Sequence, residues 1–167
     1  LYEGTWEHML RRKKVGFIVN PIAGLGGRVG LKGSDGADIV EKALALGGKP
    51  EAPIRAGYAL SVLAEMKERP KVYTYGGSMG ENQSKEFGFE TIVLGFPNEA
   101  RTTPQDTINA AKLMREAEVD LIIFAGGDGT ARNIYEAIGY SIPVIGIPAG
   151  VKIHSAVYAT NPRNAGL

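Results

Sequence analysis

The chain has 167 residues with 44% hydrophobic and 22% charged side chains, ordinary globular values that exclude a disordered or fibrous class. Its length suits one full domain and is short for two. A net charge of +1 supplies no field to attract nucleic acid or an anionic membrane, so neither is expected as a partner. The absence of Cys excludes disulfides, thiolate metal sites and thiol redox chemistry.

The two ends of the sequence indicate a cytoplasmic protein and a fragment of a longer chain. The first residues include two glutamates and lack the apolar core of a secretory signal, and no apolar stretch approaches the length of a membrane span. The sequence begins with Leu rather than Met and ends just after a loop-like segment. We interpret residues 1–14 as an N-terminal extension and residues 15–167 as one nucleotide- and phosphate-binding α/β domain.

Five short apolar runs, bounded by Gly or Pro, are typical of buried parallel strands. They lie at Val15–Val19, Lys71–Tyr75, Thr91–Leu94, Leu121–Ala125 and Pro143–Ile147.

Helical periodicity appears between these strands. Residues 37–46 form one predicted helix, with Gly47 placed to cap its C-terminus. A second helix is predicted to start near Gly57 and to end before Pro70. Its inward face is predicted to consist of Ala59, Val62, Leu63 and Met66.

A further helix has a well-defined start. Thr103 is a good N-cap, Pro104 suits the first helical position, and Asp106 follows three residues after the cap. The residues predicted to face inward are Ala110, Leu113, Met114 and Ala117. The spacing therefore predicts a capped amphipathic helix from residue 104.

Alternation of strand and helix predicts a doubly wound α/β fold, with an open, mainly parallel sheet and helices on both faces. In such sheets ligands bind beyond the carboxyl ends of the strands, where the strand order reverses. Three predicted strands end in glycine-bearing loops, which begin at Asn20, Gly76 and Gly126, and a fourth runs into residues 148–150. Parallel topology brings these loops to one edge of the sheet.

Two common phosphate-binding motifs are excluded by spacing. A Walker A loop needs Gly-Lys-Ser/Thr after four free positions, whereas Lys32 follows Leu31 and precedes Gly33. The dinucleotide fingerprint needs Gly or Ala six residues into the turn, and counting from Gly24 that position is Val29.

The segment Gly-Gly-Asp-Gly-Thr at residues 126–130, here called the glycine turn, joins a predicted strand to a predicted helix. Such a turn exposes the unpaired amides of a helix start, which bind phosphate. Asp128 needs compensation there, because a carboxylate about 4 Å from a phosphate oxygen is opposed by roughly 4 kcal/mol at an effective dielectric near 20. Bridging Mg²⁺, or a substrate hydroxyl whose proton the carboxylate accepts, would supply it.

The glycine turn also has structural interpretations. Asp128 as a helix N-cap would contribute about 1 kcal/mol and need no ligand. For the hydroxyl of Thr130, contact with phosphate or metal and satisfaction of a helix amide both remain open. We favour function for Asp128, because its turn ends a buried strand and shares its edge with three other loops.

These residues resemble a known signature. The glycine turn looks like the motif shared by NAD kinases, diacylglycerol and sphingosine kinases and, more distantly, phosphofructokinases. Further segments narrow the resemblance to the ATP-NAD kinase family, in the prokaryotic ATP-NAD kinase-like branch that includes acetoin-catabolism protein X. They are residues 19–24 (Val-Asn-Pro-Ile-Ala-Gly), 27–36, 102–107 and 148–152.

The resemblance implies transfer of the γ-phosphoryl group of ATP, or of polyphosphate, to the 2′-hydroxyl of NAD, with Mg²⁺ as cofactor. Asp128 would be the general base or orienting carboxylate. The residues expected to bind nucleotide or phosphate are Asn20, Gly24, Gly77, Gly126, Gly127, Gly129, Thr130 and Lys152. No residue is assigned as a metal ligand. ATP and NAD, or another hydroxyl acceptor, would be the partners, and association into a homo-oligomer is expected.

Family members also carry a second, β-rich domain, which this sequence does not contain, so the isolated chain is expected to be inactive. Two alternatives stay open. One is a kinase of a lipid or small alcohol with the same glycine turn. The other is a nucleotide-sensing domain that keeps the fold but does not catalyse.

Overall fold

The computed structural model describes residues 13–24, 50–148 and 158–159. The predicted helix at 37–46, the segment 27–36 and Lys152 lie outside these residues. The described elements are β1 (Lys14–Val19), α4 (Ala52–Ala64), β2 (Lys71–Thr74), the 3₁₀ turn η1 (Gly77–Met79), α5 (Glu81–Glu86), β3 (Thr91–Val93), α6 (Pro104–Glu116), β4 (Leu121–Gly126), α7 (Asp128–Ile138), β5 (Val144–Pro148) and β6 (Tyr158–Ala159).

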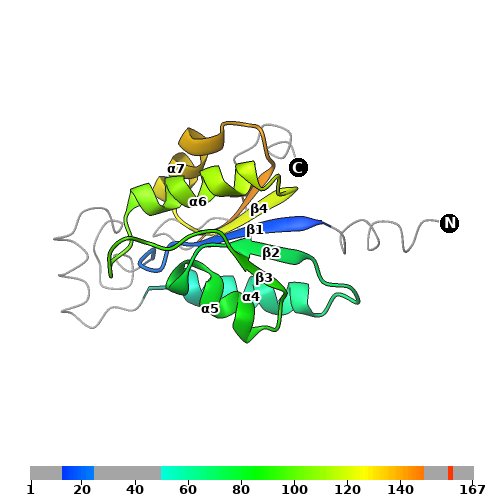
Figure 1. Cartoon of the computed structure of the whole chain (residues 1–167). Helices are drawn as coiled ribbons and strands as arrows, with labels where there is room; N and C mark the ends of the chain where they lie inside the picture. Colours follow the sequence, from blue (N-terminus) through cyan, green and yellow to red (C-terminus); the bar gives the residue numbers. More distant parts are fainter. Residues whose placement is uncertain (1–12, 25–49, 149–157, 160–167) are drawn as a thin grey trace.

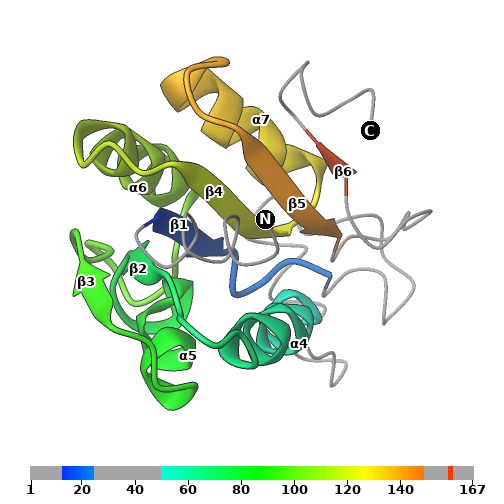
Figure 2. The same cartoon turned by 90° about the vertical axis from the view of Figure 1, so that its right-hand side faces the viewer.

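The strands form one sheet in the order β3-β2-β1-β4-β5-β6, as Figure 2 shows. Strands β1 to β5 are parallel, and β6 pairs antiparallel with β5. Helices α4 and α5 lie on one face of the sheet and α6 and α7 on the other (Figure 1). The predicted doubly wound fold and all five predicted strands are confirmed, whereas the short strand β6 was not predicted.

Successive side chains of β1 pack on opposite faces of the sheet. Phe17 and Val19 join the core beneath α4, and Ile18 joins the core formed with α6 and α7. All three are at most 1% exposed. Gly16 lets α6 approach the strand, because a Cβ there would lie 2.7 Å from Met114 Sδ. The central strand is therefore buried on both sides, as its continuous apolar sequence indicates.

The prediction for α4 was wrong in its start and its buried face. The helix begins at Ala52, five residues before the predicted start at Gly57, and it ends at Ala64. Its buried residues are Ala52, Ala56 and Leu60. Of the predicted face, Leu63 packs against the core but Val62 is 66% exposed. Two of the three buried residues are alanines, which let the helix lie close to the sheet, whereas Ile54, Tyr58 and Val62 are exposed.

The prediction for α6 is confirmed. The amide of Thr103 donates to Asp106 Oδ2 over 2.8 Å, and the two residues form a capping box. Of the four residues predicted to face inward, Ala110 and Met114 are fully buried, and the other two pack against the same core. Local capping signals and periodicity agree here, and the helix follows both.

Candidate functional site at the carboxyl edge of the sheet

The strand order reverses between β1 and β4, and two of the predicted loops meet there. Val19 pairs with Ala125, and the next amide along β1, that of Asn20, donates to the Ala125 carbonyl over 2.9 Å. On the other side of β4, Gly126 pairs with Pro148 at the end of β5. The carboxyl ends of β1, β4 and β5 therefore lie side by side at the place where doubly wound sheets bind ligands.

The glycine turn ends at the start of α7. Gly127 is the N-cap, and the first backbone bond of the helix runs from the Ala131 amide to the Gly127 carbonyl over 3.1 Å. The amides of residues 128–130 precede that bond, and helix geometry leaves them without an intrahelical acceptor. Together with the positive end of the helix dipole, these three amides form a site suited to an anion such as phosphate.

Thr130, the last residue of the glycine turn, is buried and hydrogen-bonded. The residue is 3% exposed, and its Oγ1 accepts a hydrogen bond from Asn20 Nδ2 over 3.1 Å. Asn20 Oδ1 in turn accepts from the Ile22 amide over 3.2 Å. A Cβ at Gly126 would lie 2.5 Å from Thr130 Oγ1, so only Gly fits there without movement. The Asn20–Thr130 bond thus joins the loop after β1 to the first turn of α7, a partner that sequence reasoning did not foresee for either residue.

Asp128 is exposed on the first turn of α7. The capping interpretation is wrong, because the N-cap position belongs to Gly127 and Asp128 is the first helical residue. Within the described part of the chain no hydrogen bond or ion pair involves its carboxylate. Proximity to the helix start favours this negative charge by about 0.3–1 kcal/mol. The carboxylate is therefore accessible and lies beside the three free amides.

The loop after β1 also fixes the start of α4. The Ala23 carbonyl accepts hydrogen bonds from the amides of Glu51 and Ala52, each over 3.1 Å. Gly24 is buried and has a φ of 86°, a left-handed conformation that favours glycine. The start of α4 consequently lies at the carboxyl edge of the sheet. It brings Arg55 to this edge. No sequence motif singled out Arg55, and an earlier predicted start for this helix would have revealed it.

Gly77 is the first residue of η1, which follows β2, and β2 lies on the far side of β1 from the strand that precedes the glycine turn. Its φ is 62°, and its amide donates to Glu81 Oε1 over 2.9 Å. Glu81 Oε2 accepts from Lys85 Nζ over 2.7 Å. The Gly77 amide, followed by the Lys85 ammonium, holds the pKa of the Glu81 carboxyl below its usual value. In this structure the amide of Gly77 has a protein carboxylate as its partner, and its contact with phosphate stays a prediction.

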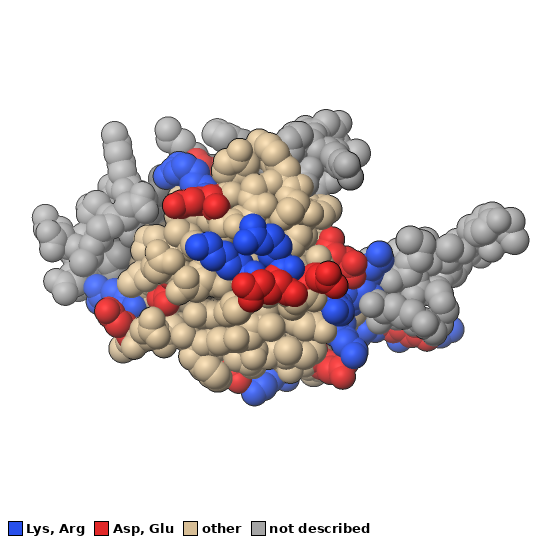
Figure 3. Space-filling model, turned by 45° about the horizontal axis from the view of Figure 1, so that its top comes forward, with Lys and Arg blue, Asp and Glu red and all other residues tan. Residues whose placement is uncertain are grey.

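The charges of the described residues are mixed in sign. On the face that Figure 3 brings forward, basic and acidic side chains lie next to one another. No group of three or more His, Cys, Asp or Glu residues that could hold a metal ion occurs among residues 13–24, 50–148 and 158–159. Over the same residues, no helix combines the length and the apolar character needed to cross a membrane.

Comparison with known proteins gives one finding. The family model described as the ATP-NAD kinase N-terminal domain matches residues 15–166. The match covers the whole glycine turn and all the described strands, apart from Lys14 at the start of β1. Neither the curated proteins nor the solved structures gave a significant match.

Proposed function

The chain belongs to the ATP-NAD kinase N-terminal domain family, and from this we propose that it transfers the γ-phosphoryl group of ATP, or of polyphosphate, to the 2′-hydroxyl of NAD. The family indicates kinase-type phosphoryl transfer, and NAD as the acceptor is our proposal. The observation that supports it best is the exposed Asp128 beside the free amides of residues 128–130 at the reversal of strand order. We also propose that residues 15–167 form one nucleotide- and phosphate-binding domain.

The backbone of the glycine turn would bind the phosphates. Gly127 and Gly129 have no side chain to block the approach of an oxygen to the amides of the first helical turn. The helix dipole favours the negative charge that the phosphates carry. The Asn20–Thr130 bond would hold the turn in place, so both side chains are assigned a positioning role. Contacts of Gly24, Gly77 and Lys152 with the nucleotide stay predictions.

Asp128 would accept the proton of the attacking hydroxyl. In this step the hydroxyl oxygen forms a bond to the γ-phosphorus, the bond to the bridging oxygen of ADP breaks, and the proton passes to the carboxylate. The residues fit Mg²⁺, because proteins commonly hold it through one or two carboxylates together with substrate phosphates, and Asp128 is exposed at this edge. When bound, Mg²⁺ would neutralise phosphate charge that otherwise opposes the carboxylate.

The test replaces Asp128 in the full-length protein. Asp128→Asn is expected to lower the rate of NADP formation from ATP, Mg²⁺ and NAD by about 10²–10⁴-fold while ATP binding persists. Glu136→Gln is the matched control, because Glu136 is an exposed carboxylate on the same helix, two turns further along. Undiminished turnover in Asp128→Asn would remove the catalytic assignment.

Substrate screening separates the alternatives. A phosphorylated lipid or small alcohol, without NADP, would identify a kinase with another acceptor. Binding of ATP without any phosphorylated product would favour a nucleotide-sensing domain. NADP formation that depends on Asp128 supports the proposal.

A further inference from the structure

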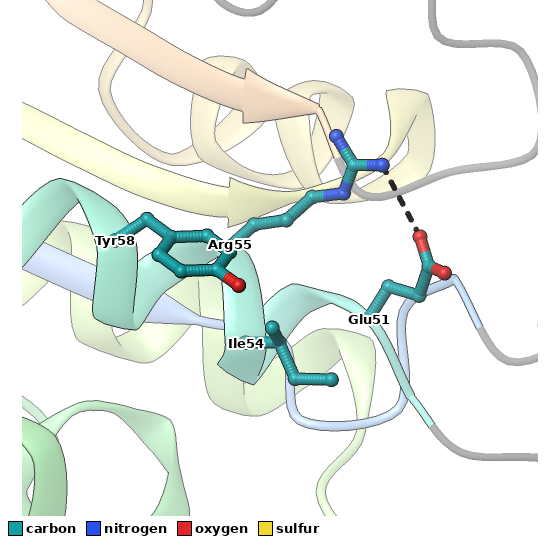
Figure 4. A pocket seen from close by; sticks show the side chains of 4 residues that line it. All are labelled: Glu51, Ile54, Arg55 and Tyr58. Carbon is teal, nitrogen blue, oxygen red and sulfur yellow. Dashed lines mark hydrogen bonds and ion pairs between the residues drawn. The ribbon is translucent and has the colours of Figure 1, made fainter.

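We propose that the first two turns of α4 carry a nucleotide subsite, in which Arg55 binds phosphate and Tyr58 stacks on the base. This inference rests on the proposed function and names side chains that would recognise its nucleotide. A surface pocket of about 360 Å³ is lined by Glu51, Ile54, Arg55 and Tyr58. Figure 4 shows Ile54, Arg55 and Tyr58 on the first turns of α4 and Glu51 just before the helix. Pockets of about 300–1,000 Å³ are usual for small ligands.

The pocket lies at the same edge of the sheet as the glycine turn. The Ala23 carbonyl binds the amides at the start of α4, and Ala23 belongs to the loop that reaches Thr130 through Asn20. The buried face of α4 packs in the core that contains Ala125, the residue just before the glycine turn. A ligand bound at this turn and a ligand bound at the start of α4 would therefore both lie at the carboxyl edge of the sheet, although α7 and α4 cover opposite faces.

Arg55 is suited to an anion. Its Nη2 lies 3.3 Å from Glu51 Oε2, and with the described residues the guanidinium makes no other hydrogen bond or ion pair. The guanidinium side chain remains 37% exposed. A guanidinium has five N–H donors in a planar fork that matches phosphate oxygens, so donors remain after the pairing with Glu51. Glu51 keeps the arginine in place and also competes with an incoming anion.

Tyr58 supplies the aromatic part of the pocket. It is 69% exposed, and Ile54, one turn earlier, is 50% exposed. An exposed aromatic ring is a platform on which a base stacks, and neighbouring apolar surface excludes water from the stacked face. An arginine beside such a ring favours one class of ligand, a flat aromatic base joined to an anionic phosphate. A nucleotide has this composition, whereas a purely apolar partner would leave Arg55 unused.

The experiment measures binding of ADP and of pyrophosphate to the full-length protein by calorimetry. Arg55→Gln is expected to weaken both ligands by about tenfold or more, the effect of losing a charged hydrogen bond. Tyr58→Ser is expected to weaken ADP by about tenfold and to leave pyrophosphate unchanged, because only ADP has a base. Glu51→Gln is expected to strengthen pyrophosphate binding by releasing Arg55.

Two control variants accompany these. Val62→Ser changes an exposed apolar side chain of α4 that does not line the pocket, and Lys112→Gln removes a positive charge from α6 on the opposite face of the sheet. Neither should alter binding. Equal affinities in wild type, Arg55→Gln and Tyr58→Ser would overturn the subsite, and NADP formation would then still support the proposed function. Arg55-dependent ADP binding without any phosphoryl transfer would support the subsite and contradict the kinase.

Discussion

A methyl group at Gly126 would have no room beneath the glycine turn. Its Cβ would lie 2.5 Å from Thr130 Oγ1 and 2.7 Å from Thr130 Cβ. Carbon atoms in contact prefer about 3.5–4.0 Å, so either the strand end or the helix start must move. Thr130 cannot turn away freely, because it is buried and bonded to Asn20. We expect Gly126→Ala to reduce the free energy of unfolding by about 1–3 kcal/mol, the usual effect of overpacking.

The same displacement should affect activity, because the first of the free amides lies only two residues after Gly126. Urea unfolding followed by circular dichroism measures the loss of stability, and NADP formation measures the effect on transfer. Gly57→Ala is the matched control. Its added Cβ would have Phe87 Cε2 as nearest neighbour at 3.9 Å, an ordinary contact. Because Gly57 lies inside α4, this change is expected to stabilise the protein by about 0.5–1 kcal/mol.

Unfolding of Gly126→Ala at the urea concentration of the wild type, with Gly57→Ala shifted as expected, would contradict the predicted clash with Thr130. The protein would then have room for a methyl group between Gly126 and Thr130. A Gly126→Ala protein with wild-type stability but no activity would instead assign the glycine to ligand contact alone.

Two further predictions concern bonds near the same edge. In a double-mutant cycle, Asn20→Ala and Thr130→Val should show a coupling of about 1 kcal/mol in urea unfolding, and additive effects would contradict a direct bond. Glu81→Gln should weaken the loss of stability at acidic pH, that is, flatten the acid limb of the curve of stability against pH. The folded pKa of Glu81 lies below its usual 4.5, so the bonds from Gly77 and Lys85 stabilise the fold fully above pH 4.5, and this contribution is lost as the pH falls through the folded pKa. Thermal melting between roughly pH 3 and 7, which includes the range where carboxyl groups titrate, measures this pH-dependent stability. If the acid limb of Glu81→Gln were unchanged, the bonds of Glu81 would not contribute to it.

The fold could be predicted because its signals are local. Buried parallel strands are apolar on both faces, and β1 from Val15 onward and the whole of β4 have this character. The capping box at Thr103 fixed the start of α6 within the sequence itself. The face of α4 could not be predicted in the same way, because two rows of side chains have helical spacing and only the sheet beneath decides which is buried. The alanine row packs there, and the larger row with Tyr58 is exposed.

The candidate site was predictable in its backbone and not in its side-chain contacts. The glycine turn, with its strand before and its helix after, follows from sequence order, and the shared edge follows from parallel topology. The bond between Asn20 and Thr130 joins residues far apart in the chain. The contact of Glu81 with the Gly77 amide depends on the unforeseen helix α5. Both depend on how the loops fold over the edge, which local sequence does not determine.

Binding and discrimination would be divided between two helix starts at this edge. The first turn of α7 offers backbone amides and one carboxylate, which recognise phosphate and a hydroxyl but carry no preference for a base. The first turns of α4 offer Arg55, Tyr58 and Ile54, which distinguish a nucleotide from bare phosphate. Changes at Tyr58 should therefore alter the choice between ATP and polyphosphate as donor, or between NAD and a simple alcohol as acceptor. Changes at Asp128 should alter the rate with every substrate, because the proton transfer is common to all of them.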